Sequence, residues 1–291
     1  MPTPDVSEQT HTPPTPCTCC AGRSPWAARR AFLLLGAGGV LAAPALAQVD
    51  VGKTSPMTKL VPAGTLEKSA TQQYSQMLAE ARAQGALAPP THAQLQRLRA
   101  IAQRLVPHAL PWNERARDWK WEVNLIGGKQ INAFVMPGGK IAFYTGILDQ
   151  LKLTDDEIAM VMGHEMAHAL REHARERLAK SQVTGLGLSL GAQLLGLGDM
   201  GNMAANLGTQ LLTLQYSRSD EGEADLVGLQ IAARAGYDPK AAITLWQKMG
   251  AATGNKAGLA FLSTHPSGPN RIKELEANLP KVDKLYRQAA R

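Results

Sequence analysis

The chain of 291 residues is 44% hydrophobic and carries seven more basic than acidic side chains. These charges form no basic block and no aromatic-interleaved patch, which excludes nucleic acid as a partner and predicts at most peripheral contact with an anionic membrane. The only cysteines are Cys17, Cys19 and Cys20, so no disulfide is available to the rest of the chain.

Residues 1–47 are predicted to be a cleaved export signal. Arg29-Arg30 precede an uncharged apolar stretch that closes with Ala45-Leu46-Ala47, an A-x-A cleavage pattern. The paired arginines also resemble a twin-arginine signal. An uncleaved membrane anchor is the alternative, and the three glycines and Pro44 in the apolar stretch disfavour it. We therefore expect a periplasmic protein that is soluble after signal cleavage.

Residues 48–90 are predicted as an extended and helical lead-in to the main domain, residues 91–291. Apolar residues at helical spacing predict helices over 65–84 and 91–105. Gly85 and Pro89-Pro90 separate them, which favours two helices packed as a hairpin.

A small antiparallel sheet is expected next. Trp119, Trp121 and Val123 alternate with polar residues, and segments 130–136 and 140–144 flank Pro137-Gly138-Gly139 as the strands of a hairpin would. Segment 130–136 is either an edge strand that pairs with an extended peptide or an ordinary interior strand. Both possibilities stay open at this point.

The run Gly163-His164-Glu165-Met166-Ala167-His168 lies within a helical pattern that opens with a capping box from Thr154 to Glu157. Two histidines four residues apart project from one helix face, as two nitrogen ligands of one metal must. Glu165 points beside them, where a general base would act on water. A solvent-facing helix with two stray histidines is the alternative, and the apolar flanks disfavour it.

The third metal ligand is predicted on a later helix. The pattern of metzincins is excluded because Arg171 and Ala174 stand where Gly and His would be needed, and His173 is expected on the wrong face of the helix. Glu221 and Asp225 lie four residues apart on a helix that begins near Ser217, so one carboxylate can bind the metal while the other accepts the free N–H of a ligating histidine. The ligand set His164, His168 and Glu221 is that of a gluzincin with one Zn²⁺ per chain.

The segment from Val183 to Leu214 is rich in Leu, Gly, Ala and Met and almost uncharged. It is predicted either as a buried helical pair that connects the two zinc-binding helices or as a mobile lid that touches the membrane. Its glycines, Asp199 and asparagines disfavour a spanning helix.

Several motifs together resemble metallopeptidase family forty-eight over roughly residues 95–280, in the family's order. They are Asn132-Ala133-Phe134 with Pro137-Gly138-Gly139, the run 163–170, Tyr216-Ser217-Arg218 with Glu221, Glu223 and Asp225, the stretch 233–239, and Thr264-His265-Pro266 with Arg271. The resemblance implies an α+β, mostly helical gluzincin-type zinc peptidase domain. It also implies endopeptidase activity and, for exported members, quality control of misfolded or membrane-associated envelope proteins.

The resemblance further implies roles for residues outside the ligand set. It places His265 over the zinc, either as a donor to the tetrahedral oxyanion or as a fourth ligand that holds the enzyme latent. It also implies that Arg271 supports the ligands, and that Asn132, Ala133 and Phe134 bind substrate.

Three functions are weighed. The first is an active zinc endopeptidase whose partners are unfolded or damaged envelope proteins. The second is a largely latent, chaperone-like binding module whose zinc is blocked by His265. The third is a structural zinc store, which leaves Glu165 without a role.

Overall fold

The computed structural model describes residues 48–183, 211, 214–253, 260–266 and 270–290. The predicted export signal and nearly all of segment 183–214 lie outside these residues. The described chain is mostly helical with a small sheet, as predicted. No described helix has both the length and the apolar content needed to cross a bilayer.

The elements follow the predicted order. The helices are α1 (Ala63–Ala83), α2 (Ala93–Ala109), α3 (Thr145–Leu151), α4 (Asp155–Leu170), α5 (His173–Val183), α8 (Arg218–Arg234), α9 (Ala241–Thr253), α10 (Ala260–Thr264) and α11 (Arg271–Ala289). The strands are β1 (Glu122–Ile126), β2 (Ala133–Met136) and β3 (Lys140–Tyr144), and the 3-10 turns are η1 (Pro56–Leu60), η2 (Leu110–Trp112) and η3 (Glu114–Arg117).

The sheet is mixed, which corrects the prediction of a purely antiparallel one. The predicted hairpin forms β2 and β3, which pair antiparallel, but β3 also pairs with β1 in parallel, giving the order β1-β3-β2. Strand β3 lies between the other two strands and runs antiparallel to β2 and parallel to β1. Alternation of apolar and polar residues marks a strand but not its direction, so the sequence did not reveal the parallel pair.

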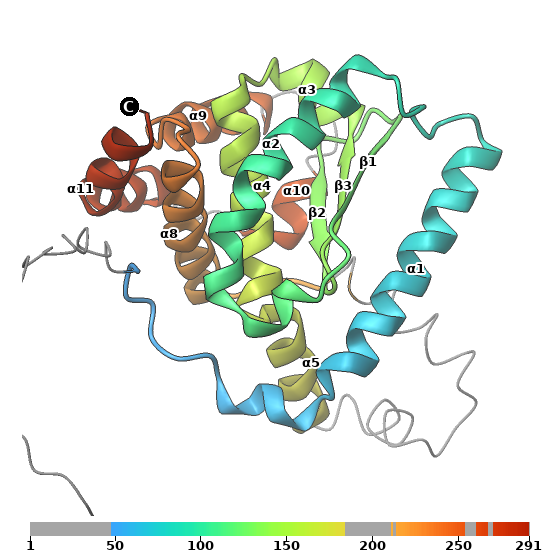
Figure 1. Ribbon diagram of the computed structural model, residues 1–291, viewed down its shortest axis with the longest axis horizontal. Coiled ribbons are helices and arrows are strands. Elements are labelled where there is room, and N and C mark those ends of the chain that lie inside the picture. The colour runs from blue at the N-terminus through green and yellow to red at the C-terminus, as the bar shows by residue number, and fades with distance from the viewer. Residues whose placement is uncertain (1–47, 184–210, 212–213, 254–259, 267–269, 291) are drawn as a thin grey trace, which may run out of the picture. The chain divides into compact units, whose positions relative to one another are not determined.

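The sheet is covered on both faces, and this separates α1 from α2. Val123, Val135 and Phe143 belong to the core cluster that includes α2 and α4, whereas Met136 and Ala142 pack with side chains of α1. The predicted helical hairpin is therefore wrong. The connection after α1 bridges to β1 at Leu87 and Ile126, so α1 and α2 reach opposite faces (Figure 1).

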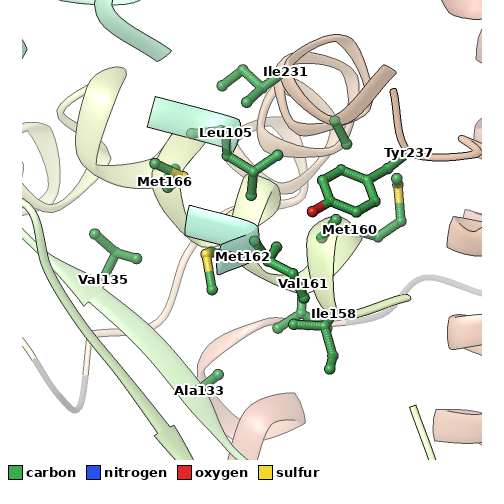
Figure 2. Close-up of a cluster of buried hydrophobic side chains, with 14 of the residues drawn as sticks. Leu105, Ala133, Val135, Ile158, Met160, Val161, Met162, Met166, Ile231 and Tyr237 are labelled. Carbon is green, nitrogen blue, oxygen red and sulfur yellow. The ribbon is translucent and has the colours of Figure 1, made fainter. Parts of the chain in front are cut away.

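Helix α4 is the centre of the fold. Thr154 and Glu157 form the predicted capping box, and every side chain from Glu157 to Leu170 is buried. The helix packs between α8 and β2 and also contacts α2 (Figure 1). Figure 2 shows Met162 and Met166 of α4 in the same apolar cluster as Val135 of β2. The apolar series read from the sequence therefore surrounds the histidine motif with dry packing.

Two glycines bring α4 and α8 close together. A Cβ at Gly228 would lie 2.7 Å from the backbone N of His164, and one at Gly163 would lie 3.0 Å from the carbonyl O of Gly228. Only glycine fits such an approach without moving a backbone. The contact sets His164 directly against the helix that carries Glu221 and Asp225.

Candidate metal centre

Four buried side chains from three elements meet beside the α4–α8 contact. His164 and His168 come from α4, Glu221 from the first turn of α8, and His265 follows α10 directly. Each offers one donor atom, and these four atoms all lie within 4.8 Å of one another. The structure thus brings together the three predicted ligands and His265, which was predicted to lie over the zinc.

The individual distances describe a tight donor group. The Nε2 atoms of His164 and His168 are 3.1 Å apart, and each lies 3.3–3.4 Å from a carboxylate oxygen of Glu221. His265 Nδ1 is 3.0 Å from Glu221 Oε1 and 3.4 Å from His164 Nε2. Two imidazoles and a carboxylate are a donor set that zinc prefers, so the residues present fit the metal that the sequence predicts.

Asp225 and Arg271 hold the ligand side chains in place through hydrogen bonds. His164 Nδ1 lies 2.9 Å from Asp225 Oδ1, so it can donate its N–H while Nε2 faces the other ligands. Arg271 donates from Nη1 to Glu221 Oε2 at 2.6 Å and from Nη2 to Asp225 Oδ1 at 2.7 Å. Its guanidinium also stacks on the ring of Trp246, with 3.9 Å to the centroid.

Burial and charge act against each other at these groups. Burial lowers the pKa of His164, but Asp225 and Glu221 outweigh it and raise that pKa to about 9. Burial raises the pKa of Glu221, yet the three histidines hold it far below its usual range. The pKa of His168 lies well below its usual value, chiefly because of burial. Glu221 is therefore a permanent carboxylate, as a metal ligand must be.

Glu165 lies next to the donor group with one oxygen uncommitted. Its side chain is buried, and its Oε1 accepts no hydrogen bond from the residues that the structure describes. The backbone N–H of Val135 in β2 donates to the carboxylate, and His265 Nε2 lies 3.3 Å from Oε1. Burial raises the pKa of Glu165. A carboxylate with a free oxygen and a raised pKa is suited to accept a proton.

A cleft opens along β2 in front of these residues. Asn132, Ala133 and Phe134 all line it, together with Glu165, His168 and His265. Strand β2 lies at one edge of the described sheet, so the edge-strand alternative, rather than the interior one, describes its position. The side chains of Ala133 and Phe134 point to opposite faces of the sheet.

The sequence reasoning missed His173. His173 was expected on the wrong face of the helix that carries His164, but α4 ends at Leu170 and Glu172 adopts a left-handed backbone with φ of 59°. This turn places His173 against the ligand His168, with the Nδ1 atoms of the two side chains 2.9 Å apart. His173 is correctly excluded from the donor group, but the argument from its helix face is wrong. No glycine or proline marks this turn, so the sequence carried little signal for it.

Tyr216 is a second neighbour to which the sequence reading gave no role. Its ring stacks on His168, with centroids 3.9 Å apart, and it lines the cleft. Burial raises its pKa far above the usual value, so the phenol stays protonated. The sequence feature that could have pointed to Tyr216 is its place in the Tyr216-Ser217-Arg218 motif.

Comparison with known proteins finds one family over most of the chain. Residues 92–279 match the description "Peptidase family M48". Mitochondrial metalloendopeptidase OMA1 of Schizosaccharomyces pombe is 42% identical over 167 residues, which are 57% of this chain and 48% of that protein.

Two relatives come from Escherichia coli. Metalloprotease LoiP is 28% identical over 65% of this chain and 72% of its own length. The beta-barrel assembly-enhancing protease is 29% identical over 62% of this chain and 37% of its own length. The chain spans half or less of the length of the OMA1 relatives that it matches.

Proposed function

The chain belongs to peptidase family M48, and we propose on that premise that it is a zinc-dependent endopeptidase. The observation that carries the proposal is the buried group of His164, His168 and Glu221 beside Glu165, whose Oε1 has no hydrogen-bond partner within the described chain. A structural zinc site has no use for such a carboxylate. A hydrolase needs one to take the proton of water.

The roles of the residues follow from their contacts. His164, His168 and Glu221 would hold zinc, which when bound acidifies water and stabilises negative charge on a carbonyl oxygen. Glu165 accepts the proton of the attacking water and returns it to the leaving amine. The N–H of Val135 fixes one side of Glu165 and leaves Oε1 for this transfer.

Substrate binding is assigned to the edge of β2. An extended peptide that pairs with this edge lies along the cleft lined by Asn132, Ala133 and Phe134. The same cleft contains Glu165, so a paired peptide passes the general base. Only an unfolded segment can add a strand in this way, which supports unfolded or damaged proteins as substrates.

Replacing Glu165 tests the proposal. We expect Glu165→Gln to retain zinc, measured by metal analysis of the purified protein, and to cleave casein at least about a hundredfold more slowly. The matched control is Glu80→Gln, which removes an exposed carboxylate from α1 outside the cleft and should change the rate little. Wild-type protein that contains zinc but leaves casein intact would refute the endopeptidase proposal.

A latent state is the second candidate function, and the position of His265 supports it. Its Nδ1 lies within the donor group, where it can serve as a fourth ligand in place of water. Its Nε2 lies 3.3 Å from Glu165 Oε1, so the same side chain also stands close to the general base. A protein resting in this state would bind unfolded chains and cleave them only after His265 moves away.

The His265→Ala variant separates the two roles of this histidine. If His265 blocks the site, casein cleavage should rise. If it instead donates to the oxyanion, cleavage should fall by about a hundredfold or more. Thr264→Ala changes the neighbouring residue of the cleft and is the control. An unchanged rate in His265→Ala would eliminate both roles.

The cellular setting is proposed from the predicted export signal and the two bacterial relatives. We infer that the protein acts in the periplasm on misfolded or membrane-associated envelope proteins. The OMA1 relatives are named as mitochondrial, so the family alone does not select a compartment. Fractionation of cells that produce the full chain, with and without Arg29-Arg30 changed to Lys-Lys, tests export. Retention of both forms in the cytoplasm would contradict it.

A further inference from the structure

His173 makes a contact that the zinc-endopeptidase proposal does not use. Its side chain is only 2% exposed, and its Nδ1 lies 2.9 Å from Nδ1 of His168. Its other nitrogen, Nε2, makes no hydrogen bond within the described part of the chain and lies 3.7 Å from Glu223 Oε1. A buried imidazole with this arrangement sits between a metal ligand and a carboxylate.

The tautomers of the two histidines follow from the geometry. His168 faces Glu221 and His164 through Nε2, so a metal there takes the Nε2 lone pair and leaves the proton on Nδ1. That N–H must donate to Nδ1 of His173, because this is the nitrogen 2.9 Å away. His173 then carries its own proton on Nε2, directed toward Glu223. Each proton has one place in this chain of contacts.

Glu223 is held in place on the side of His173 toward which this N–H points. Its Oε1 accepts a hydrogen bond from Nε of Arg171, and Arg171 is itself fixed by donating from Nη2 to the carbonyl of Gly52 at 2.9 Å. Paired with the guanidinium of Arg171, this carboxylate presents its oxygens as hydrogen-bond acceptors.

We propose that His173 is a positioning residue for the zinc ligand His168, and that Glu223 fixes the tautomer of His173. This pair does for His168 what Asp225 does for His164, whose Nδ1 lies at the same 2.9 Å from its acceptor. The two ligating imidazoles are thus oriented by different means, one by a carboxylate directly and the other through a second imidazole. The proposal rests on the zinc site of the proposed function.

The test measures zinc affinity directly, by competition with a chromophoric chelator at constant pH and without substrate. His173→Leu places an apolar side chain of similar size in this position and removes the acceptor, and we expect it to weaken zinc binding about 10- to 100-fold. His173→Asn places an oxygen acceptor near the position of Nδ1, and we expect affinity within about threefold of wild type. His92→Leu, at the N-cap position just before α2 and outside the site, is the matched control and should bind zinc as wild type does.

The outcomes are distinct. Wild-type affinity in His173→Leu would overturn the proposal. Equal weakening in His173→Leu and His173→Asn would also overturn it, because the acceptor would then not matter and His173 would serve only packing. Thermal unfolding of the metal-free variants shows whether either has lost its fold. If wild type binds zinc but cleaves no peptide, the endopeptidase function fails while the affinity ratio still decides the role of His173. If wild type binds no zinc, both fail.

Discussion

Charged side chains around the donor group lie next to side chains of opposite charge. Arg271 contacts both Glu221 and Asp225, so one guanidinium offsets part of two buried carboxylates. The remaining negative charge raises the pKa of His164 to about 9. Because a ligating imidazole must be neutral, this raised pKa opposes metal binding as pH falls. The same counter-charge principle operates at the amino-terminal end of α4, far from the ligands.

Glu157, in the capping box of α4, provides a pH-dependent test at this scale. Its side chain is 3% exposed and accepts hydrogen bonds from Lys248 at 2.6 Å, the N–H of Thr154 and Thr244. Burial raises its pKa, but these three partners lower it overall. Because the folded pKa lies below the unfolded value, the stabilisation is complete above about pH 4.5 and is lost as pH falls through the folded pKa.

We therefore expect Glu157→Gln to lower the free energy of unfolding by about 1.5–3 kcal/mol at pH 7, and by progressively less toward pH 3. Urea unfolding at a series of pH values measures this difference. Asp149→Asn changes an exposed carboxylate whose partner is Gln94, and it should stay within about 0.5 kcal/mol of wild type. A gap between wild type and Glu157→Gln that is constant from pH 7 to pH 3 would contradict the assignment.

The elements differ in how far the sequence could predict them. Helix α4 was predictable because its capping box and its apolar series both lie within one short stretch. The close approach of α4 and α8 was not, since Gly163 and Gly228 are far apart in sequence and look like ordinary helix glycines. The contact of His173 with His168 was not predictable either, because neither glycine nor proline marks the left-handed turn at Glu172. The parallel pairing of β1 with β3 was not predictable either, because alternation of apolar and polar residues does not encode strand direction.

Gly228→Ala tests the contact between α4 and α8. The new Cβ would lie 2.7–2.9 Å from the backbone of Gly163 and His164, and backbone atoms cannot move aside easily. We expect a loss of about 1–3 kcal/mol in the free energy of unfolding, together with weaker zinc binding, because the strain separates His164 from Glu221.

The control for this variant lies on the same helix. A Cβ at Gly222 meets nothing within 4 Å, so Gly222→Ala should keep the zinc site and gain about 0.4–1 kcal/mol from the better helix propensity of alanine. Urea unfolding and chelator competition measure both variants. Equal stability of Gly228→Ala and Gly222→Ala would show that the two helices tolerate a wider separation.

At the scale of the whole molecule, the lead-in and the main domain are less separate than the sequence suggested. The segment before α1 is attached to the α4–α8 pair through Val49, whose N–H donates to Gln230, and through Gly52, which accepts from Arg171. Helix α1 packs on β2 and β3. The composition break at Pro89-Pro90 marks a change of direction in the chain, and the sequence alone could not distinguish this from a domain boundary.

The two-sided cover of the sheet has a consequence for how small the working protein can be. The family match begins at residue 92, after α1 has ended. A chain shortened to that point would expose Ile126, Met136 and Ala142 to solvent. The cleft would also lose the part of its wall that Leu66 and Glu67 form. The region that matches the family is therefore shorter than the part of this chain that is needed to bury both faces of the sheet and to complete the cleft, because that part includes α1.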